Sequence, residues 1–95
     1  MKLRSIRHKG LRGLIENDDP AGLPAAQSAK IAAILTYLQA APDIDAIRRL
    51  QSWKAHQLSG DRKGVWSLTV SKNWRITFRV NSDAEIIDLD FEDYH

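Results

Sequence analysis

Five side chains in this sequence carry the groups that acid–base chemistry on a phosphate requires. His56 and His95 are imidazoles, whose pKa ordinarily lies near neutrality, so each can accept or donate a proton. Arg75 presents a planar fork of donors that suits a phosphate group. The chain ends in Asp93, Tyr94 and His95, where a carboxylate could orient a histidine and a phenol ring could position a nucleotide. If the fold brings them together, these five residues form a candidate catalytic site.

Such a set suits the cleavage of RNA, because RNA carries its own nucleophile, the 2′-hydroxyl. One group removes the 2′ proton, a second protonates the departing 5′-oxygen, and a cation stabilises the charge that develops on the phosphate. This route needs no metal ion and no cofactor. Two histidines and a carboxylate could also bind a metal, but no helical or turn spacing groups them locally. Which histidine is the acid and which is the base stays open.

Each candidate also has an ordinary structural interpretation. A lone histidine such as His56 is more often a surface or structural residue than a catalytic one, and chain ends such as His95 often fray. Tyr94 could fill the end of the core. Arg75 could pair with an acid across a sheet, which is worth under about 1 kcal/mol when the pair is exposed. The acids between residues 88 and 92 could form the solvated face of a strand.

Charge is segregated along the chain, although the net charge is only +2. Residues 1–12 hold five bases and no acid, and residues 48–79 hold eight bases and one acid. Residues 83–95 hold six acids and no base. A basic face of this kind suits a polyanionic partner. A solvated surface that happens to be segregated explains the same pattern equally well.

Length and composition limit the class of protein. With 95 residues the chain has room for one domain, 1–95, and a modest core. It has no cysteine, which excludes disulfides, thiolate metal sites and a cysteine nucleophile. No apolar stretch is long enough for a secretory signal or a membrane span. We therefore expect a cytoplasmic protein without membrane contact.

The first half of the chain predicts helices. Residues 2–6 are expected to form a short strand, and residues 8–16 a short helix. A longer helix is predicted over 25–40, with Pro24 able to occupy its first turn. Its apolar stripe consists of Ile31, Ile34, Leu35 and Leu38. Residues 43–53 are expected to form a connection or a short helical turn.

The second half changes from a helical to an alternating period. The runs 65–70, 74–80 and 87–91 alternate apolar and polar residues between turn-forming segments, which predicts an antiparallel meander. Residues 54–58 are expected to add a strand of their own. Two N-terminal helices packed on one face of this small twisted sheet would bury the apolar stripes, which gives an α+β fold.

Strand parity predicts which side chains reach the other, open face. Trp66 and Trp74 share the parity of the core, so we expect them to pack inside rather than stack on nucleobases. No parity argument applies to Trp53. The side chains of opposite parity, which point away from the helices, are those of Arg75, Thr77 and Arg79.

Four segments stand out as a set. They are R-H-K-G-L at 7–11, K-A-H-Q-L-S-G-D-R-K-G-V-W-S at 54–67, N-W-R-I-T-F at 73–78 and E-D-Y-H at 92–95. Together they resemble the HigB branch of the RelE-type toxins, over essentially the whole chain. The resemblance implies a RelE-like fold and a toxin of a type II toxin–antitoxin pair. Such toxins cut mRNA in the ribosomal A site by the 2′-hydroxyl route without a metal.

The resemblance also assigns residues. The family's active-site positions fall on His56, Arg75, Asp93, Tyr94 and His95. One departure is clear: toxins of this branch commonly have a lysine three residues after the motif histidine, and this chain has Ser59. Transition-state stabilisation would then be weaker, or Lys54 or Lys63 would substitute, so a mild toxin is expected.

The partners follow from the same resemblance. They are a HigA-type helix-turn-helix antitoxin, the 70S ribosome with its mRNA, and operator DNA only through the antitoxin complex. The basic residues expected to contact RNA backbone are Lys54, Arg62, Lys63, Lys72 and Arg79. The alternative is a non-catalytic or weakly catalytic domain that binds RNA, the ribosome or a protein and acts mainly as antitoxin partner and co-repressor. The replacement of the family lysine by Ser59 favours that alternative.

Overall fold

The structure is a computed structural model, and it describes residues 1–93. The helices come first along the chain and are α1 (Lys9–Asn17), α2 (Ser28–Ala40) and α3 (Ile44–Arg48). The strands follow as β1 (His56–Gln57), β2 (Trp66–Thr69), β3 (Trp74–Val80) and β4 (Ile86–Asp93), with the short 3-10 helix η1 (Gly60–Arg62) between β1 and β2. Each strand pairs antiparallel with the next in the order β1-β2-β3-β4. The predicted α+β fold and antiparallel meander are confirmed.

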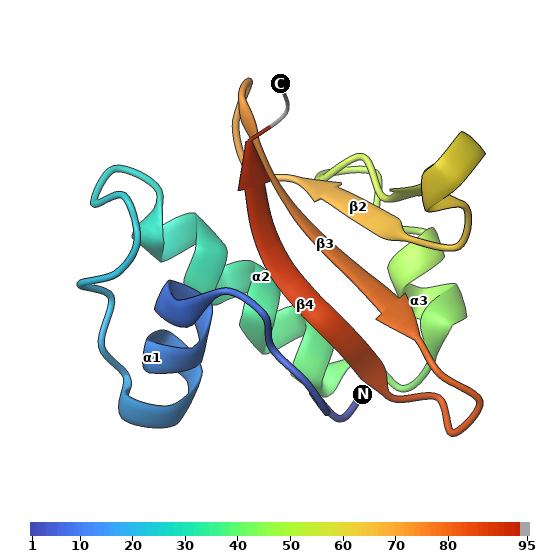
Figure 1. The fold of residues 1–95 in the computed structure, drawn as a ribbon, viewed down its shortest axis with the longest axis horizontal. Helices are drawn as coiled ribbons and strands as arrows, with labels where there is room; N and C mark the ends of the chain where they lie inside the picture. Colours follow the sequence, from blue (N-terminus) through green and yellow to red (C-terminus); the bar gives the residue numbers. More distant parts are fainter. Residues whose placement is uncertain (94–95) are drawn as a thin grey trace.

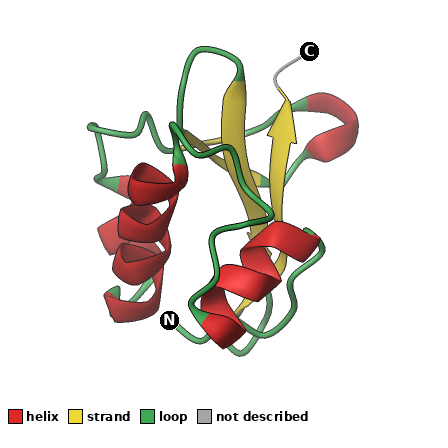
Figure 2. Cartoon of the chain, turned by 90° about the vertical axis from the view of Figure 1, so that its left-hand side faces the viewer, coloured by secondary structure: helices red, strands yellow, loops and turns green. Residues whose placement is uncertain are grey.

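The helices cover one face of this sheet. In Figure 1, α2 and α3 pass behind the strands, and in the side view of Figure 2 one long helix stands to the left of the strands while another lies in front of them. The predicted apolar stripe of α2 is buried, with exposed fractions of 0–3%. The helix begins at Ser28, later than predicted, because Pro24 opens a separate turn in which the Gln27 N–H donates to the Pro24 carbonyl at 3.0 Å. None of the described helices is long and apolar enough to cross a membrane.

The helix α1 begins at a histidine cap. The His8 Nδ1 atom accepts hydrogen bonds from the N–H groups of Gly10 and Leu11 at 3.0 and 3.4 Å. These are donors that the first turn of a helix leaves without a partner inside the helix. The His8 ring also packs edge-on against Phe91, with 5.6 Å between the ring centres. His8 is therefore a structural residue, and the helix predicted over 8–16 is confirmed with a shift of one residue.

The strand predicted over 2–6 is reduced to two isolated parallel bridges, Leu3 to Ile86 and Ile6 to Leu89. The cause is a bulge in β4. Thr77 pairs with Asp90 but Arg79 pairs with Ile87, so β4 has one more residue than β3 across this stretch. Because the bulge interrupts β4, the N-terminal segment cannot form a continuous ladder along its outer edge.

The core confirms the parity prediction for the tryptophans of the sheet. Trp66 is buried together with Ile76 and Phe78. Trp74 is partly buried and stacks on Phe91, with 4.7 Å between ring centres. The position of Trp53, left open by the sequence, is also structural: its ring meets that of Tyr37 edge-on at 5.7 Å. None of these three tryptophans is an exposed stacking platform.

Candidate active site

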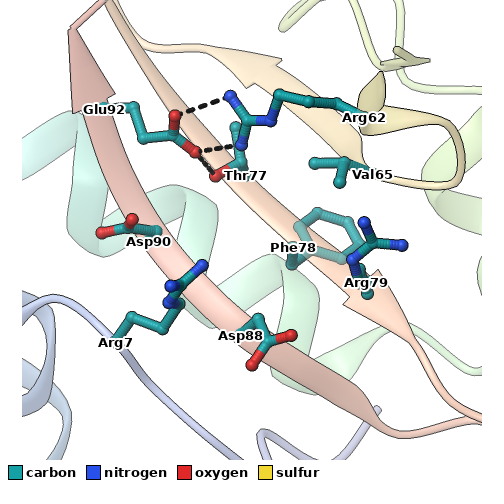
Figure 3. Close-up of a pocket in the computed structure, with 9 residues that line it drawn as sticks. All are labelled: Arg7, Arg62, Val65, Thr77, Phe78, Arg79, Asp88, Asp90 and Glu92. Carbon is teal, nitrogen blue, oxygen red and sulfur yellow. Dashed lines mark hydrogen bonds and ion pairs between the residues drawn. The ribbon is translucent and has the colours of Figure 1, made fainter. Parts of the chain in front are cut away.

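The face of the sheet away from the helices is less open than the alternating pattern predicts. Thr77 lies in the middle of β3 on this face, yet only 2% of it is exposed, and its β2 neighbour Ser67 is fully buried. The cover comes from Arg62 in η1 and Glu92 in β4, whose side chains meet above Thr77 (Figure 3). The prediction of a solvated polar face is therefore wrong at its centre, because an ion pair fills that space.

This ion pair is bidentate. Arg62, Glu92 and Thr77 together are called the Arg62–Glu92 clamp below. The two Nη atoms of Arg62 donate to the two carboxylate oxygens of Glu92 at 2.8 and 2.6 Å. The Thr77 hydroxyl donates to the same carboxylate. Parallel charge-assisted bonds of this kind are among the strongest polar contacts in proteins. The acidic run of β4 is thus more than a solvated strand face, since Glu92 is held from two other elements.

The clamp stays charged at neutral pH. The hydrogen bonds from Arg62 hold the pKa of Glu92 below its usual value, against the effect of burial, and Thr77 and the charge of Arg75 act in the same direction. In return, the Glu92 carboxylate raises the pKa of Arg62. The side chain of Arg62 is 41% exposed and that of Glu92 is 22% exposed, so water screens the attraction between their charges in part. Both groups are therefore ionised whenever the protein is folded near neutrality.

His56 lies on β1, which is shorter than the strand predicted over 54–58. Lys54 has a left-handed backbone conformation, with φ of 50°, which ends the strand on that side. Its carbonyl oxygen lies 2.7 Å from the His56 Nδ1 atom. A carbonyl can only accept, so Nδ1 carries the proton in this contact and Nε2 is left to exchange one. The side chain of His56 is exposed, as an acid or base for an external substrate has to be.

Arg75 lies on β3, two residues before Thr77, and shares with Thr77 the face of the sheet away from the helices. It is opposite Thr69 on β2 and Glu92 on β4, and it is half-buried. His56 is opposite Ser67, which is opposite Thr77, so His56 and Arg75 are two strands and two residues apart. At the usual strand spacing this is a sideways separation of about 10 Å.

The predicted C-terminal site residues are placed only in part. Asp93 is the last residue of β4, opposite Trp74, and it is exposed. Its parity differs from that of Glu92, so it extends from the end of the sheet rather than from the face that carries the clamp. Tyr94 and His95 lie outside the described residues. His56 and Arg75 share one face of the sheet by strand alternation, whereas Asp93 lies at the end of β4, and the roles of all five residues remain predictions.

The basic residues predicted to bind RNA fall into two groups. Lys54, Lys63, Lys72 and Arg79 are exposed, and Arg79 donates to the Lys63 carbonyl at 3.4 Å. Arg62 differs, because its guanidinium is engaged by Glu92. A cavity of about 80 Å³ beside the clamp has a further arginine, Arg7, in its wall (Figure 3). The carboxylates in that wall belong to Asp88, Asp90 and Glu92.

Two features of this site escape the sequence patterns. The clamp joins residues that are 30 positions apart, and the only signal for it is that Arg62 and Glu92 both lie in segments that carry the family resemblance. Arg7 reaches the site from the N-terminal segment, which strand periodicity does not connect to the meander. Among residues 1–93, no group of three or more histidines, aspartates or glutamates could hold a metal ion.

Comparison with known proteins agrees with the fold and the motifs. Residues 4–95 match the protein family described as the RelE-like toxin of type II toxin–antitoxin system HigB. The chain is also similar to the Endoribonuclease HigB of Proteus vulgaris, with 45% identity over 94 residues, which covers 98% of this chain and 99% of that protein. The helices on an antiparallel sheet are what a RelE-like fold requires. The chain therefore belongs to the HigB family of RelE-like toxins of type II toxin–antitoxin systems.

Proposed function

We propose that this toxin is an endoribonuclease that cuts mRNA on the ribosome and so inhibits translation. The observation that carries the proposal is His56, an exposed histidine whose Nδ1 is fixed by the Lys54 carbonyl and whose Nε2 is left for proton exchange, two strands from Arg75. The similarity to a protein named Endoribonuclease HigB supports the same activity. Such a toxin acts in the cytoplasm, where its substrate is.

The chemistry uses the RNA's own nucleophile. The 2′-oxygen loses its proton to a base and attacks the phosphorus, and the bond to the 5′-oxygen breaks as that oxygen takes a proton from an acid. His56 and His95 are the acid and the base in either order. Arg75 holds the scissile phosphate and stabilises its growing charge. Tyr94 positions the nucleotide and Asp93 supports a histidine.

The position of Ser59 affects the strength of this activity. Lysine is common at this place in the family, and a serine hydroxyl cannot supply its positive charge. Two exposed lysines flank the position, Lys54 on the β1 side and Lys63 after η1. Either can substitute as a cation near the phosphate. The toxin is therefore a mild one.

The partners of the toxin follow from its family and its charge. A type II toxin has an antitoxin, which we assign to the HigA-type helix-turn-helix proteins, with operator DNA bound only through their complex. The exposed bases Lys54, Lys63, Lys72 and Arg79 contact the RNA backbone of the 70S ribosome. Arg62 is a less direct contact, because Glu92 already neutralises it.

Cleavage of mRNA on translating ribosomes by the purified toxin tests this function. We expect cleavage by the wild-type protein and a loss of at least about 100-fold in His56→Ala and Arg75→Ala. Gln57→Ala is the matched control, since Gln57 is the exposed neighbour of His56 on the same strand. If both site variants cut mRNA normally while the control does too, the assigned site is wrong.

A second function, binding without catalysis, is favoured by Ser59 and by the ion pair that covers the centre of the sheet face. In that case the toxin blocks translation, or acts as a co-repressor, by occupying RNA or a protein. The same assay separates the two functions. Stalled translation with intact mRNA supports binding alone, and cut mRNA excludes it.

A further inference from the structure

We propose that the Arg62–Glu92 clamp is a positioning device, which fixes the spacing between the strand that carries His56 and the strand end that carries Asp93. The proposal rests on the proposed function, because the groups that it positions are those of the RNA-cleaving site. It assigns Arg62, Glu92 and Thr77 as positioning residues, none of which touches the reacting atoms.

Each clamp residue is attached to a segment that carries one proposed catalytic group. Arg62 ends η1, which is the next element along the chain after β1 and its His56. Thr77 is two residues from Arg75 on β3, and its side chain lies on the same face. Glu92 is the residue before Asp93 at the end of β4. A contact among these three side chains therefore joins the three segments of the site.

The backbone alone connects these segments weakly. Within residues 1–93, β1 has two residues and pairs only with β2, whereas β4 pairs with β3. The spacing between His56 and the end of β4 therefore depends on three consecutive strand pairings, the first of them two residues long. The Arg62–Glu92 bonds instead join η1, which follows β1 along the chain, directly to the end of β4. Since the catalysis of bond cleavage is sensitive to displacements of about 1 Å, this crossing is where the geometry is set.

The charges of the clamp also indicate a positioning role for Arg62 rather than a phosphate contact. Both of its Nη atoms already donate to Glu92, at 2.8 and 2.6 Å. A phosphate approaching Arg62 would meet the Glu92 carboxylate, which carries the same sign of charge and whose pKa is lowered so that it stays ionised. The Thr77 hydroxyl, on an almost fully buried residue, binds that carboxylate from below. Arg62 thus acts through Glu92.

The test measures the cleavage rate of saturated toxin–ribosome complexes in a single turnover, together with the affinity for the ribosome. We expect Glu92→Gln and Arg62→Ala to slow cleavage by about 10–100-fold while affinity changes less than about twofold. Arg62→Lys, which keeps one bond to the carboxylate, should fall between Arg62→Ala and wild type. Glu85→Gln is the matched control, because Glu85 is also ion-paired at an end of the β3–β4 hairpin but lies away from the site. Thermal unfolding confirms that each variant is folded at the assay temperature.

A double variant distinguishes a clamp from two separate contacts. If Arg62 and Glu92 act only through each other, Arg62→Ala combined with Glu92→Ala cleaves no more slowly than the slower single variant. If Arg62 binds a phosphate, Arg62→Ala weakens ribosome affinity and lowers its salt slope by about one, and Glu92→Ala does neither. Losses that multiply in the double variant, or a rate within twofold of wild type in Glu92→Gln and Arg62→Ala, would overturn the proposal.

A readout without RNA keeps the proposal separate from the function on which it rests. The imidazole nitrogen resonances of His56 and the amide resonance of Asp93 report the two segments that the clamp joins. We expect the His56 resonances to shift in Glu92→Gln and the Asp93 amide resonance to shift in Arg62→Ala, and neither to shift in Glu85→Gln. If the wild-type toxin does not cut mRNA, the proposed function fails, and the resonances alone decide on the clamp: shifts at both sites support it, and unchanged resonances overturn it.

Discussion

The two ends of β4 carry glutamates of similar burial that are held in different ways. Glu85, just before the strand, and Glu92, near its end, are 17% and 22% exposed. Glu85 meets two well-exposed cations, the Nζ of Lys2 at 3.8 Å and the Nε of Arg4 at 3.9 Å. Glu92 meets one guanidinium with both oxygens, at 2.8 and 2.6 Å. The difference lies in the geometry of the contact and in the exposure of the cations rather than in the burial of the glutamates.

This difference separates the turn end of the hairpin from the end that lies near the proposed site. Glu85 joins the N-terminal segment to the β3–β4 turn, where Asn81 also donates to it at 3.1 Å. Loose pairs to exposed cations contribute little free energy, typically under about 1 kcal/mol. Glu92 instead joins elements that carry the proposed catalytic groups. Substitutions at the Glu92 end should therefore change mRNA cleavage, whereas substitutions at the Glu85 end should change only the stability of the fold.

The largest expected effect is on catalysis at the Glu92 end. His56→Ala should reduce mRNA cleavage by at least about 100-fold, because it removes a group that transfers a proton. The free energy of unfolding should change little, since the side chain is exposed. Primer extension on toxin-treated ribosomes measures the cleavage, and urea unfolding measures the free energy of unfolding. Glu85→Gln should leave cleavage unchanged, and a comparable loss in that variant would erase the distinction between the two ends.

The next effect concerns the salt dependence of ribosome binding. Removing an exposed basic side chain near the site, in Lys63→Ala or Arg79→Ala, should lower the slope of log affinity against log salt by about 0.7–1. Lys30→Ala is the control, because Lys30 is an exposed lysine on α2, on the helical side of the molecule. A binding titration at several salt concentrations measures the slopes. Equal slopes for all three variants would contradict an RNA contact at this side of the sheet.

A smaller effect is expected in stability as a function of pH. Glu92 has a lowered pKa in the folded protein, so the folded state binds fewer protons than the unfolded chain in mild acid. The stability that it contributes is present in full above its ordinary pKa of about 4.3 and is lost as the pH falls through the lowered value. Glu92→Gln should thus cost about 1 kcal/mol near neutrality and progressively less in acid. Urea unfolding over a pH series measures this, and a pH-independent cost would contradict it.

The smallest effect should appear at the Glu85 end. Ala84 has a left-handed backbone conformation, with φ of 59°, which strains any residue with a Cβ atom. Ala84→Gly should raise the free energy of unfolding by about 0.5 kcal/mol, since relief of strain exceeds the added freedom of the unfolded chain. Cleavage should not change. A destabilised variant would show that the turn tolerates alanine without strain.

The sequence predicts the parts of this fold that depend on periodicity. The apolar stripe of α2 and the alternation along β2 and β3 each indicate which face meets the core. In β4 the alternation holds for Leu89 and Phe91 but fails before the bulge, where Ile86 is buried in place of the predicted Ile87. The ends of helices and strands were less predictable where the backbone conformation of a single residue or turn determines them. The turn at Pro24 delays α2, and the left-handed Lys54 delays the start of β1 to His56.

The candidate site residues were chosen by type, and their roles remain predictions; their arrangement was only partly predictable. Parity places Arg75 and Thr77 on the same face, which the structure confirms. The clamp was not predictable in this way, because contacts of long side chains such as Arg62 and Glu92 depend on the path of a loop and not on a strand period. The bulge in β4 likewise depends on pairing with β3, so no pattern within residues 86–93 indicates it.

The N-terminal segment has a consequence for how the toxin behaves at high concentration. Its N–H and carbonyl groups occupy the outer edge of β4 at Ile86 and Leu89, with distances of 2.7–3.1 Å. The opposite edge, β1, offers only two residues. Long unpaired edges are the usual templates on which sheets of different molecules join. With one edge occupied and the other too short, the free toxin is protected against edge-to-edge aggregation when no antitoxin is bound.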